Sequence, residues 1–301
     1  MTSPWDLYDQ LIDEIPADIT VTQIHTDGKW RRVASSEDGV GMAFGMNVQS
    51  RPRATEDPAD LVGRPLRDVA ALAKSWNFED AGIGMAAVNA YHSHPVRALA
   101  HGFRPCKENN WARTFHPYAP LVAGKRVAII GHFPFAAAAM PDTAELNILE
   151  RNVFEGDYPD SACEYLLPEM DYVFISGSAF VNKTMPRLLA LASDAHTVVL
   201  GPSAPASPAI LQAGATTVMS FASAHPARLE DGHAGRSLLG MYDAGMTAQG
   251  SRPRPDVEAV ARARSHVIPA IQAKGGLALI TADHGNADHM YDVVDGEKKP
   301  F

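Results

Sequence analysis

The chain has 301 residues, of which 46% are hydrophobic and 20% charged, and its formal net charge is −9. This length allows two domains, and the composition is ordinary for a globular protein. The negative charge argues against nucleic acid as the main partner, because nucleic-acid-binding proteins carry a basic surface. The acidic, amphipathic start is unlike a signal peptide, and no apolar run approaches the ~18 residues of a membrane span. We therefore expect a cytoplasmic protein with no membrane partner.

Residues 1–100 have the pattern of an α+β domain. Alternating apolar and polar residues predict three strands, and Asp-Gly pairs between them predict the hairpin turns of an antiparallel meander. Two helices follow, and the small residues of the second imply close packing against a neighbour. The predicted strands span 19–25, 30–34 and 41–44, and the two helices span 66–74 and 79–91.

After an irregular linker at 101–123, strand and helix patterns alternate through residues 124–248. Such alternation predicts a parallel sheet in a Rossmann-like ligand-binding domain, so the fold class is α/β. A tail at 249–301 begins with a Gly, Ser, Pro and Arg hinge and continues as a helix and a strand. The predicted strands of the parallel sheet begin at residues 127, 146, 172, 197 and 217.

Polar residues follow the predicted strand at 172–175. Ser176 ends that strand, and Asn182, Lys183 and Thr184 lie between it and the next helix. In open α/β sheets this crevice is where small molecules bind. An amide, a cation and a hydroxyl there can hold a carboxylate or phosphate. The alternative is a helix cap by Asn182 or Thr184, with Lys183 in solvent.

Two other loops lie at predicted strand ends. The turn after the first strand contains Gly131, His132 and Phe133, and it lacks the GxGxxG pattern that brings backbone against a pyrophosphate, so we expect no NAD. His132 either contacts a ligand or has a structural role. Ser203 follows the fourth strand, where it forms a wall of the crevice or, like Ser207, caps the next helix.

Three clusters of potential metal ligands also have structural alternatives. Carboxylates around a cysteine suit a metal, but they also suit an acidic helix start. Histidines at the end of the helix at 79–91 suit the helix dipole, or a metal site completed from the following loop. Acidic and histidine side chains after the last predicted strand suit a divalent metal. The clusters are Asp157, Asp160, Cys163 and Glu164; His92 and His94 with His101 or His116; and Asp283, His284, Asp288 and His289.

Residues 1 to about 245 resemble a bacterial and archaeal family of heavy-metal chelation proteins, in which an enolase-N-terminal-like domain precedes a Rossmann-like domain. The resemblance implies a ligand cleft between the domains, lined by Asn77, the 131–135 turn, Ser176, Asn182, Lys183, Thr184 and Ser203. Four segments carry it: SWNFEDAGIGMAAVNAYHSH, GKRVAIIGHFPF, GDYPDSACEYLLPEMDYVFISGSAFVNKT and VVLGPSAPASPAIL.

From about residue 256 the tail resembles part of the cofactor-independent phosphoglycerate mutases of the alkaline-phosphatase superfamily. The carrying segment is VEAVARARSHVIPAIQAKGGLALITADHGNADHMYDVVDGEKKPF. The resemblance implies that Asp283 and His284 of the ADHGN loop are metal ligands. The chain has no counterpart of the serine nucleophile segment, and two-metal phosphoryl transfer needs that nucleophile and both ligand sets.

These features predict a protein that binds a divalent transition metal, or a small anionic or metal-chelating molecule, in a cleft between its domains. We favour binding over catalysis because no complete catalytic constellation is present. A Rossmann-type enzyme acting on a nucleotide or S-adenosyl compound is the alternative, and mutase-type phosphoryl transfer is a third that depends on the tail alone. A homo-oligomer is left open.

Overall fold

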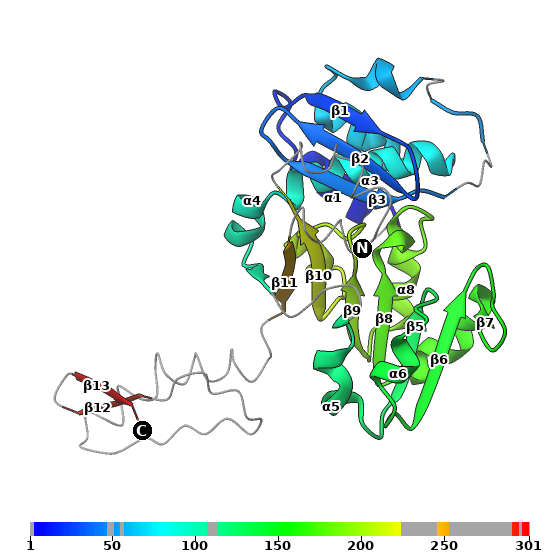
Figure 1. Ribbon diagram of the computed structural model, residues 1–301, viewed down its shortest axis with the longest axis vertical. Coiled ribbons are helices and arrows are strands. Elements are labelled where there is room, and N and C mark those ends of the chain that lie inside the picture. The colour runs from blue at the N-terminus through cyan, green and yellow to red at the C-terminus, as the bar shows by residue number, and fades with distance from the viewer. Residues whose placement is uncertain are drawn as a thin grey trace. The chain divides into compact units, whose positions relative to one another are not determined.

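The structure is a computed structural model, and it describes residues 3–46, 51–54, 57–106, 113–223, 246–252, 291–294 and 297–300. Its contacts divide the chain into two units, Met1–Arg252 and Pro253–Phe301. The first unit contains both the N-terminal meander and the parallel sheet (Figure 1). In the second unit, β12 (Tyr291–Val294) and β13 (Glu297–Pro300) form an antiparallel pair. The helix and strand that we predict between 257 and 280 lie outside the described residues.

The N-terminal sheet is the predicted antiparallel meander, in the order β1-β2-β3. The strands are β1 (Val21–His25), β2 (Trp30–Ser35) and β3 (Val40–Phe44), and the helices are α1 (Asp6–Asp13), α2 (Leu66–Ala70), α3 (Phe78–His92) and α4 (Pro95–Ala100). The small residues of α3 allow the predicted close packing. A Cβ atom on Gly84 would lie 1.9 Å from the backbone nitrogen of Ala73, and one on Gly41 in β3 would lie 1.9 Å from the carbonyl oxygen of Ala86.

The second sheet has eight strands in the order β4-β11-β10-β9-β8-β5-β6-β7. The strands from β10 to β7 in this order pair in parallel, which confirms the predicted α/β class. The parallel strands are β5 (Arg126–Ile130), β6 (Glu145–Glu150), β7 (Tyr158–Pro159), β8 (Tyr172–Ser176), β9 (His196–Leu200) and β10 (Thr217–Ala222). The helices around them are α5 (Ala119–Val122), α6 (Ala136–Ala139), α7 (Cys163–Leu166), α8 (Met185–Leu191) and α9 (Pro208–Gln212).

The parallel strands form because both faces of the sheet are covered. In β8, Val173 and Ile175 belong to one buried cluster, whereas Phe174 between them belongs to another. Val199 and Val198 divide in the same way in β9. A strand that is buried on both faces has a continuous apolar sequence, not an alternating one. This is why the strands could be predicted from short apolar runs.

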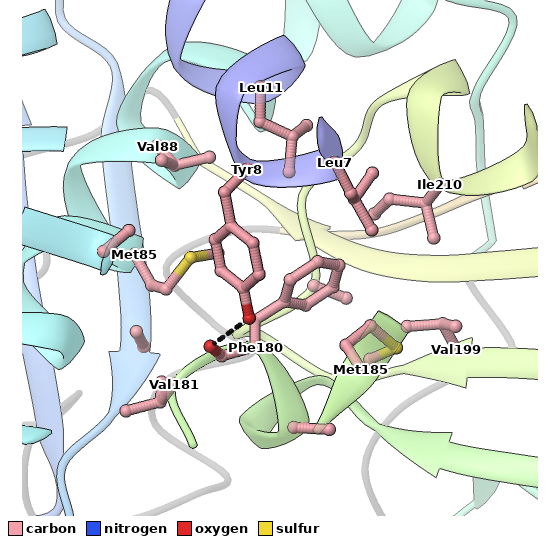
Figure 2. Packing of buried hydrophobic residues seen from close by; sticks show 14 of the residues in the cluster. Leu7, Tyr8, Leu11, Met85, Val88, Phe180, Val181, Met185, Val199 and Ile210 are labelled. Atoms are coloured by element: carbon pink, nitrogen blue, oxygen red, sulfur yellow. Dashed lines mark hydrogen bonds between the residues drawn. The ribbon is translucent and has the colours of Figure 1, made fainter. Parts of the chain in front are cut away.

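One hydrophobic core joins the N-terminal helices to the parallel sheet. Figure 2 shows Tyr8 of α1 between residues of α3 and the loop that precedes α8. The Tyr8 hydroxyl donates a hydrogen bond of 2.7 Å to the carbonyl oxygen of Phe180. The rings of these two residues meet edge to face, with their centroids 6.0 Å apart. The two sheets are therefore held in one compact unit by buried contacts.

Two antiparallel strands extend the parallel sheet where we expect a linker and a hinge. β11 (Met246–Ser251) pairs with β10, and β4 (Arg104–Pro105) pairs with β11. The sheet therefore runs to Ser251, beyond the predicted domain boundary at residue 248. A Cβ atom on Gly250 would lie 2.9 Å from the ring of Phe103, so this glycine in β11 gives room to a buried aromatic side chain.

Candidate functional site

The strand order creates a topological switch point between β5 and β8. From β5 the chain continues to β6 and β7 on one side, whereas β8, β9 and β10 lie on the other side. In such sheets a crevice opens at the carboxyl ends of the two strands where the order reverses, and ligands bind there. Gly131 follows β5, Glu150 ends β6 and Ser176 ends β8. Because these strands are parallel, the three residues lie at the same edge of the sheet.

Two adjoining cavities of about 610 and 280 Å³ occupy this edge, and we call them together the switch-point cleft. The N-terminal sheet supplies one wall through the β1–β2 turn and the end of β3. The ends of β5, β6, β8 and β9 supply the other. Six residues line both cavities, which makes the two continuous: Lys29, Phe44, Gly131, Glu150, Ser176 and Ser178.

Gly131 allows the bottom of the cleft to stay open. Its φ is +113°, a conformation that side chains rarely adopt. A Cβ atom there would lie 3.2 Å from both the ring of Phe133 and the Cβ of Ser176. Glycine is thus required both by the backbone and by the close approach of β8. The turn departs from the dinucleotide pattern but retains this one glycine.

His132 is held in a defined orientation at the rim of the smaller cavity. Its backbone N–H donates to Glu150 Oε2 at 3.0 Å, and its Nδ1 lies 2.9 Å from Asp157 Oδ2. The imidazole also packs on the ring of Phe154, with 4.3 Å between centroids. Phe133 lines the same cavity but is buried, and the centroid of its ring lies 5.4 Å from that of Phe115. His132 offers a polar edge, whereas Phe133 forms part of the floor.

Asn182, Lys183 and Thr184 do not face the same space. Asn182 and Thr184 line the larger cavity of the cleft, whereas Lys183 lines a separate cavity. The φ of Lys183 is +69°, which is unusual for a residue with a side chain. Asn182 Oδ1 accepts hydrogen bonds from the Thr184 backbone N–H at 3.1 Å and from its hydroxyl at 2.6 Å. These bonds fix the loop, and no described residue accepts a hydrogen bond from the Asn182 amide N–H groups, which can donate to a ligand.

Ser203 and Asn77 have structural partners. Ser203 lines the smaller cavity, and its Oγ accepts a hydrogen bond of 2.9 Å from the Phe44 backbone N–H. Asn77 is 1% exposed and is not among the described residues that line the cleft. It caps α3: its Oδ1 accepts from the backbone N–H of Glu79 at 3.0 Å, while its amide donates to the carbonyl of Arg51.

The other predicted clusters are occupied by structural contacts. Arg187 lies 3.3 Å from an oxygen of Asp160 and 3.2 Å from one of Glu164, so these carboxylates already have a cation. Burial raises the pKa of the neighbouring Cys163 thiol to about 11, which keeps it protonated. His94 caps α4 by accepting from the Val96 backbone N–H.

His92 is fully buried, and its Nε2 lies 2.8 Å from the Leu11 carbonyl oxygen. Within the described ranges, no three His, Cys, Asp or Glu side chains are grouped as a metal site. Asp283 and His284, together with Asp288 and His289, lie outside those ranges.

Several cleft residues were not predicted. Glu150 ends the strand after β5, about 20 residues beyond Gly131, which is the position where dinucleotide-binding sheets carry an acidic residue. Its place at a strand end was a signal that could have found it. Lys29, Phe44 and Phe78 come from the N-terminal domain, and only tertiary packing brings them to the cleft. Their local sequence gives no indication of this.

The fold and the cleft together define an α/β protein with a ligand site at the switch point of a parallel sheet. Two family models, each described as "Putative heavy-metal chelation", match residues 8–92 and 115–233. A crystal structure of a protein of unknown function from the DUF364 family of Desulfitobacterium hafniense is 34% identical, with a TM-score of 0.75. The alignment covers 84% of this chain and all of that one. The chain therefore belongs to the DUF364 family.

More distant relatives agree with this fold. A DUF364 protein of unknown function from Pyrococcus horikoshii is 20% identical, with a TM-score of 0.67 over 83% of this chain and all of that one. An uncharacterized protein of Methanocaldococcus jannaschii is 26% identical over 190 residues, which is 60% of this chain and 68% of that protein. Among the helices that the structure describes, none is long and apolar enough to span a bilayer.

A short segment of the chain matches a different kind of protein. It is 51% identical over 41 residues to a 2,3-bisphosphoglycerate-independent phosphoglycerate mutase of Methanosarcina barkeri. The match covers 14% of this chain and only 8% of the mutase. This agrees with the resemblance of the tail to a fragment of that family.

Proposed function

We propose that the protein binds a small anionic organic molecule that itself chelates a divalent transition metal, and that the complex occupies the switch-point cleft. The observation that carries this proposal is the 610 Å³ cavity at the switch point. Its volume lies in the range of about 300–1,000 Å³ that is typical of small-molecule sites. A single ion needs far less space, whereas an organic chelate of several ligand groups would fill it.

The charges of the lining favour an anion. Lys29 and Arg151 line the larger cavity, and the Arg151 guanidinium lies 5.9 Å from the centroid of the Phe78 ring. The two carboxylates of the lining are already engaged. Glu150 accepts from backbone N–H groups, including that of His132, and Asp160 pairs with Arg187. Paired carboxylates repel an anionic ligand less than free ones do.

Neutral polar groups and aromatic walls complete the fit. Ser176 and Ser178 hydroxyls lie 2.9 Å apart at the end of β8, beside Asn182. Hydroxyl and amide groups can donate to carboxylate oxygens of a ligand. Phe44 and Phe78 provide the apolar surface that ligand pockets generally combine with a few polar groups. In this proposal the atoms that coordinate the metal belong chiefly to the chelator. The description of the family as heavy-metal chelation proteins supports the presence of a metal in the ligand.

Calorimetric titration of the full chain tests this proposal. The probes are hydrated Ni²⁺, citrate and the nickel–citrate complex. We expect saturable one-to-one binding of nickel citrate that is at least tenfold tighter than binding of Ni²⁺ or citrate alone. Binding of the hydrated ion as tight as that of the complex would replace the proposal with a direct metal site. Heats no larger than those of an unrelated control protein with all three probes would contradict both.

One observation favours a second candidate, a ligand with a ribose. Glu150 occupies the position that holds ribose hydroxyls in nucleotide-binding sheets of this topology. A carboxylate has lone pairs for these hydroxyls beyond those used by backbone N–H groups. S-adenosylmethionine and adenosine in a thermal-shift assay test this candidate. Stabilisation that is lost in Glu150→Gln but kept in Glu155→Gln would favour it, and no shift with either compound would exclude it.

A further inference from the structure

A third cavity, of about 490 Å³, lies on the other side of the loop that carries Asn182 and Thr184. Most of its wall is apolar and comes from α1, α8 and the residues before α3. Among the described residues, none that lines it also lines the switch-point cleft. We call it the tryptophan cavity, after Trp5 and Trp76. The other principal wall residues are Tyr8, Pro186 and Ala190.

Lys183 places an amine beside this cavity. Its Nζ lies 6.0 Å from the ring centroid of Trp76 and 5.4 Å from that of Phe78. Trp76 lines the tryptophan cavity, whereas Phe78 lines the switch-point cleft, so the amine lies on the partition between them. The Nζ donates one hydrogen bond of 2.8 Å to the carbonyl oxygen of Val181.

The backbone of Lys183 is in a conformation that costs free energy. Its φ of +69° is in the left-handed region, where Gly and Asn are favoured over lysine. Lys183 lines the tryptophan cavity, whereas its neighbours Asn182 and Thr184 line the switch-point cleft. A strained residue held in place by buried neighbours is a reason to look for a function of its side chain.

The surroundings of the amine are those of a nucleophile. No carboxylate in the described part of the chain forms an ion pair with Lys183, and burial lowers its pKa to about 7. The charged and titratable groups that line the same cavity are Arg187, which is paired with Asp160 and Glu164, and Tyr8, whose pKa burial raises. A desolvated lysine with this pKa has a substantial neutral fraction near pH 7, and the neutral amine attacks carbonyl carbons.

We propose that Lys183 forms a Schiff base with an aldehyde or ketone whose flat apolar group occupies the tryptophan cavity. The Nζ lone pair forms a bond to the carbonyl carbon, and the C=O π pair moves to the oxygen. The oxygen then takes up one of the two amine hydrogens as a proton. Loss of the second amine hydrogen with that hydroxyl releases one water and leaves a C=N bond. No oxidant or reductant is needed. This site does not depend on what binds in the switch-point cleft.

Reductive trapping tests the proposal on the full chain. The protein is incubated at pH 7 with benzaldehyde and sodium cyanoborohydride, and the labelled lysine is located by peptide mass spectrometry. We expect Lys183 to be labelled at least roughly tenfold faster than the exposed Lys29 and Lys125, because burial lowers the pKa of Lys183 and so increases its reactive neutral form at this pH. Lys183→Arg should abolish this fast phase, and an unchanged melting temperature would show that the variant is folded.

Two further arms separate the proposal from general lysine reactivity. The rate at which Lys183 is labelled should rise with pH and reach half of its maximum near pH 7. The Trp76→Ala variant lets water reach the amine, so it should move this midpoint to a higher pH. Glyoxylate, an anionic aldehyde without an apolar group, should label Lys183 more slowly than benzaldehyde does. Equal rates for the three lysines, or a fast phase that persists in Lys183→Arg, would overturn the proposal. Equal rates for the two aldehydes would overturn the assignment of ligand class.

Discussion

Ser203 and Phe44 join the two sheets at the edge of the switch-point cleft. Ser203 Oγ accepts a hydrogen bond of 2.9 Å from the Phe44 backbone N–H, although 159 residues separate them in the chain. Phe44 ends β3 of the N-terminal sheet, and Ser203 follows β9 of the parallel sheet. The bond therefore fixes the distance between the two walls of the cleft.

Replacing Ser203 with alanine should weaken both folding and binding. The Phe44 N–H would lose its acceptor in a partly buried position, at a cost of about 1–2 kcal/mol in the free energy of unfolding. Urea unfolding measures this cost. Ser161→Ala, at an exposed serine, is the control and should change the stability by less than about 0.5 kcal/mol. Equal effects of the two variants would show that the Ser203 bond does not stabilise the cleft.

Replacing Tyr8 with phenylalanine should destabilise the whole of the first unit. The change keeps the ring but removes the donor to the buried carbonyl of Phe180, and an unsatisfied buried acceptor costs about 1–3 kcal/mol. The loss should appear as a lower midpoint in urea with an unchanged slope. Tyr165 is 80% exposed, so Tyr165→Phe is the matched control and should be neutral. A neutral Tyr8→Phe variant would mean that the hydroxyl bond contributes little.

His92 should make the protein less stable in mild acid. Burial lowers its pKa from 6.5 to about 4, so between these values the unfolded chain binds more protons than the folded one. The free energy of unfolding therefore falls as the pH drops through this window, by up to about 1.4 kcal/mol per pH unit. Burial raises the pKa of Glu14, whose carboxylate lies 3.6 Å from His92 Nδ1, and this offsets part of the slope.

Unfolding experiments between pH 4 and 7 check the role of His92. In His92→Gln the slope with pH should flatten, because the group that takes up the proton is gone. His116 is exposed, and His116→Gln should retain the slope of the parent. A parent protein whose stability is constant across this range would contradict the burial of a neutral imidazole.

The central strands β8 and β9 of the parallel sheet could be predicted from the sequence because each is buried on both faces. Val173, Phe174 and Ile175 form one apolar run, although alternate residues pack on opposite sides. The antiparallel strands β4 and β11 could not be predicted in this way. They lie at one end of the strand order, and Gln249 and Gly250 resemble a turn when read without their partners.

The cleft was predicted where its residues follow strands directly, as Gly131 and Ser176 do. It could not be predicted that Lys183 lines a different cavity from Asn182 and Thr184, because the positive φ of Lys183 depends on the packing of the loop. Lys29 reaches the cleft from a hairpin turn in the other sheet, and no local pattern marks it.

The most direct test of the account is nickel–citrate titration of Gly131→Val beside Gly124→Ala. Both glycines have positive φ, but a Cβ atom at Gly124 meets no atom within 4 Å, whereas one at Gly131 meets Phe133 and Ser176 at 3.2 Å. Both variants carry backbone strain, and only the first intrudes on the cleft. We predict that Gly131→Val weakens binding of the complex at least tenfold while Gly124→Ala binds as the parent does. Equal binding by a folded Gly131→Val variant would contradict a ligand site at the switch point.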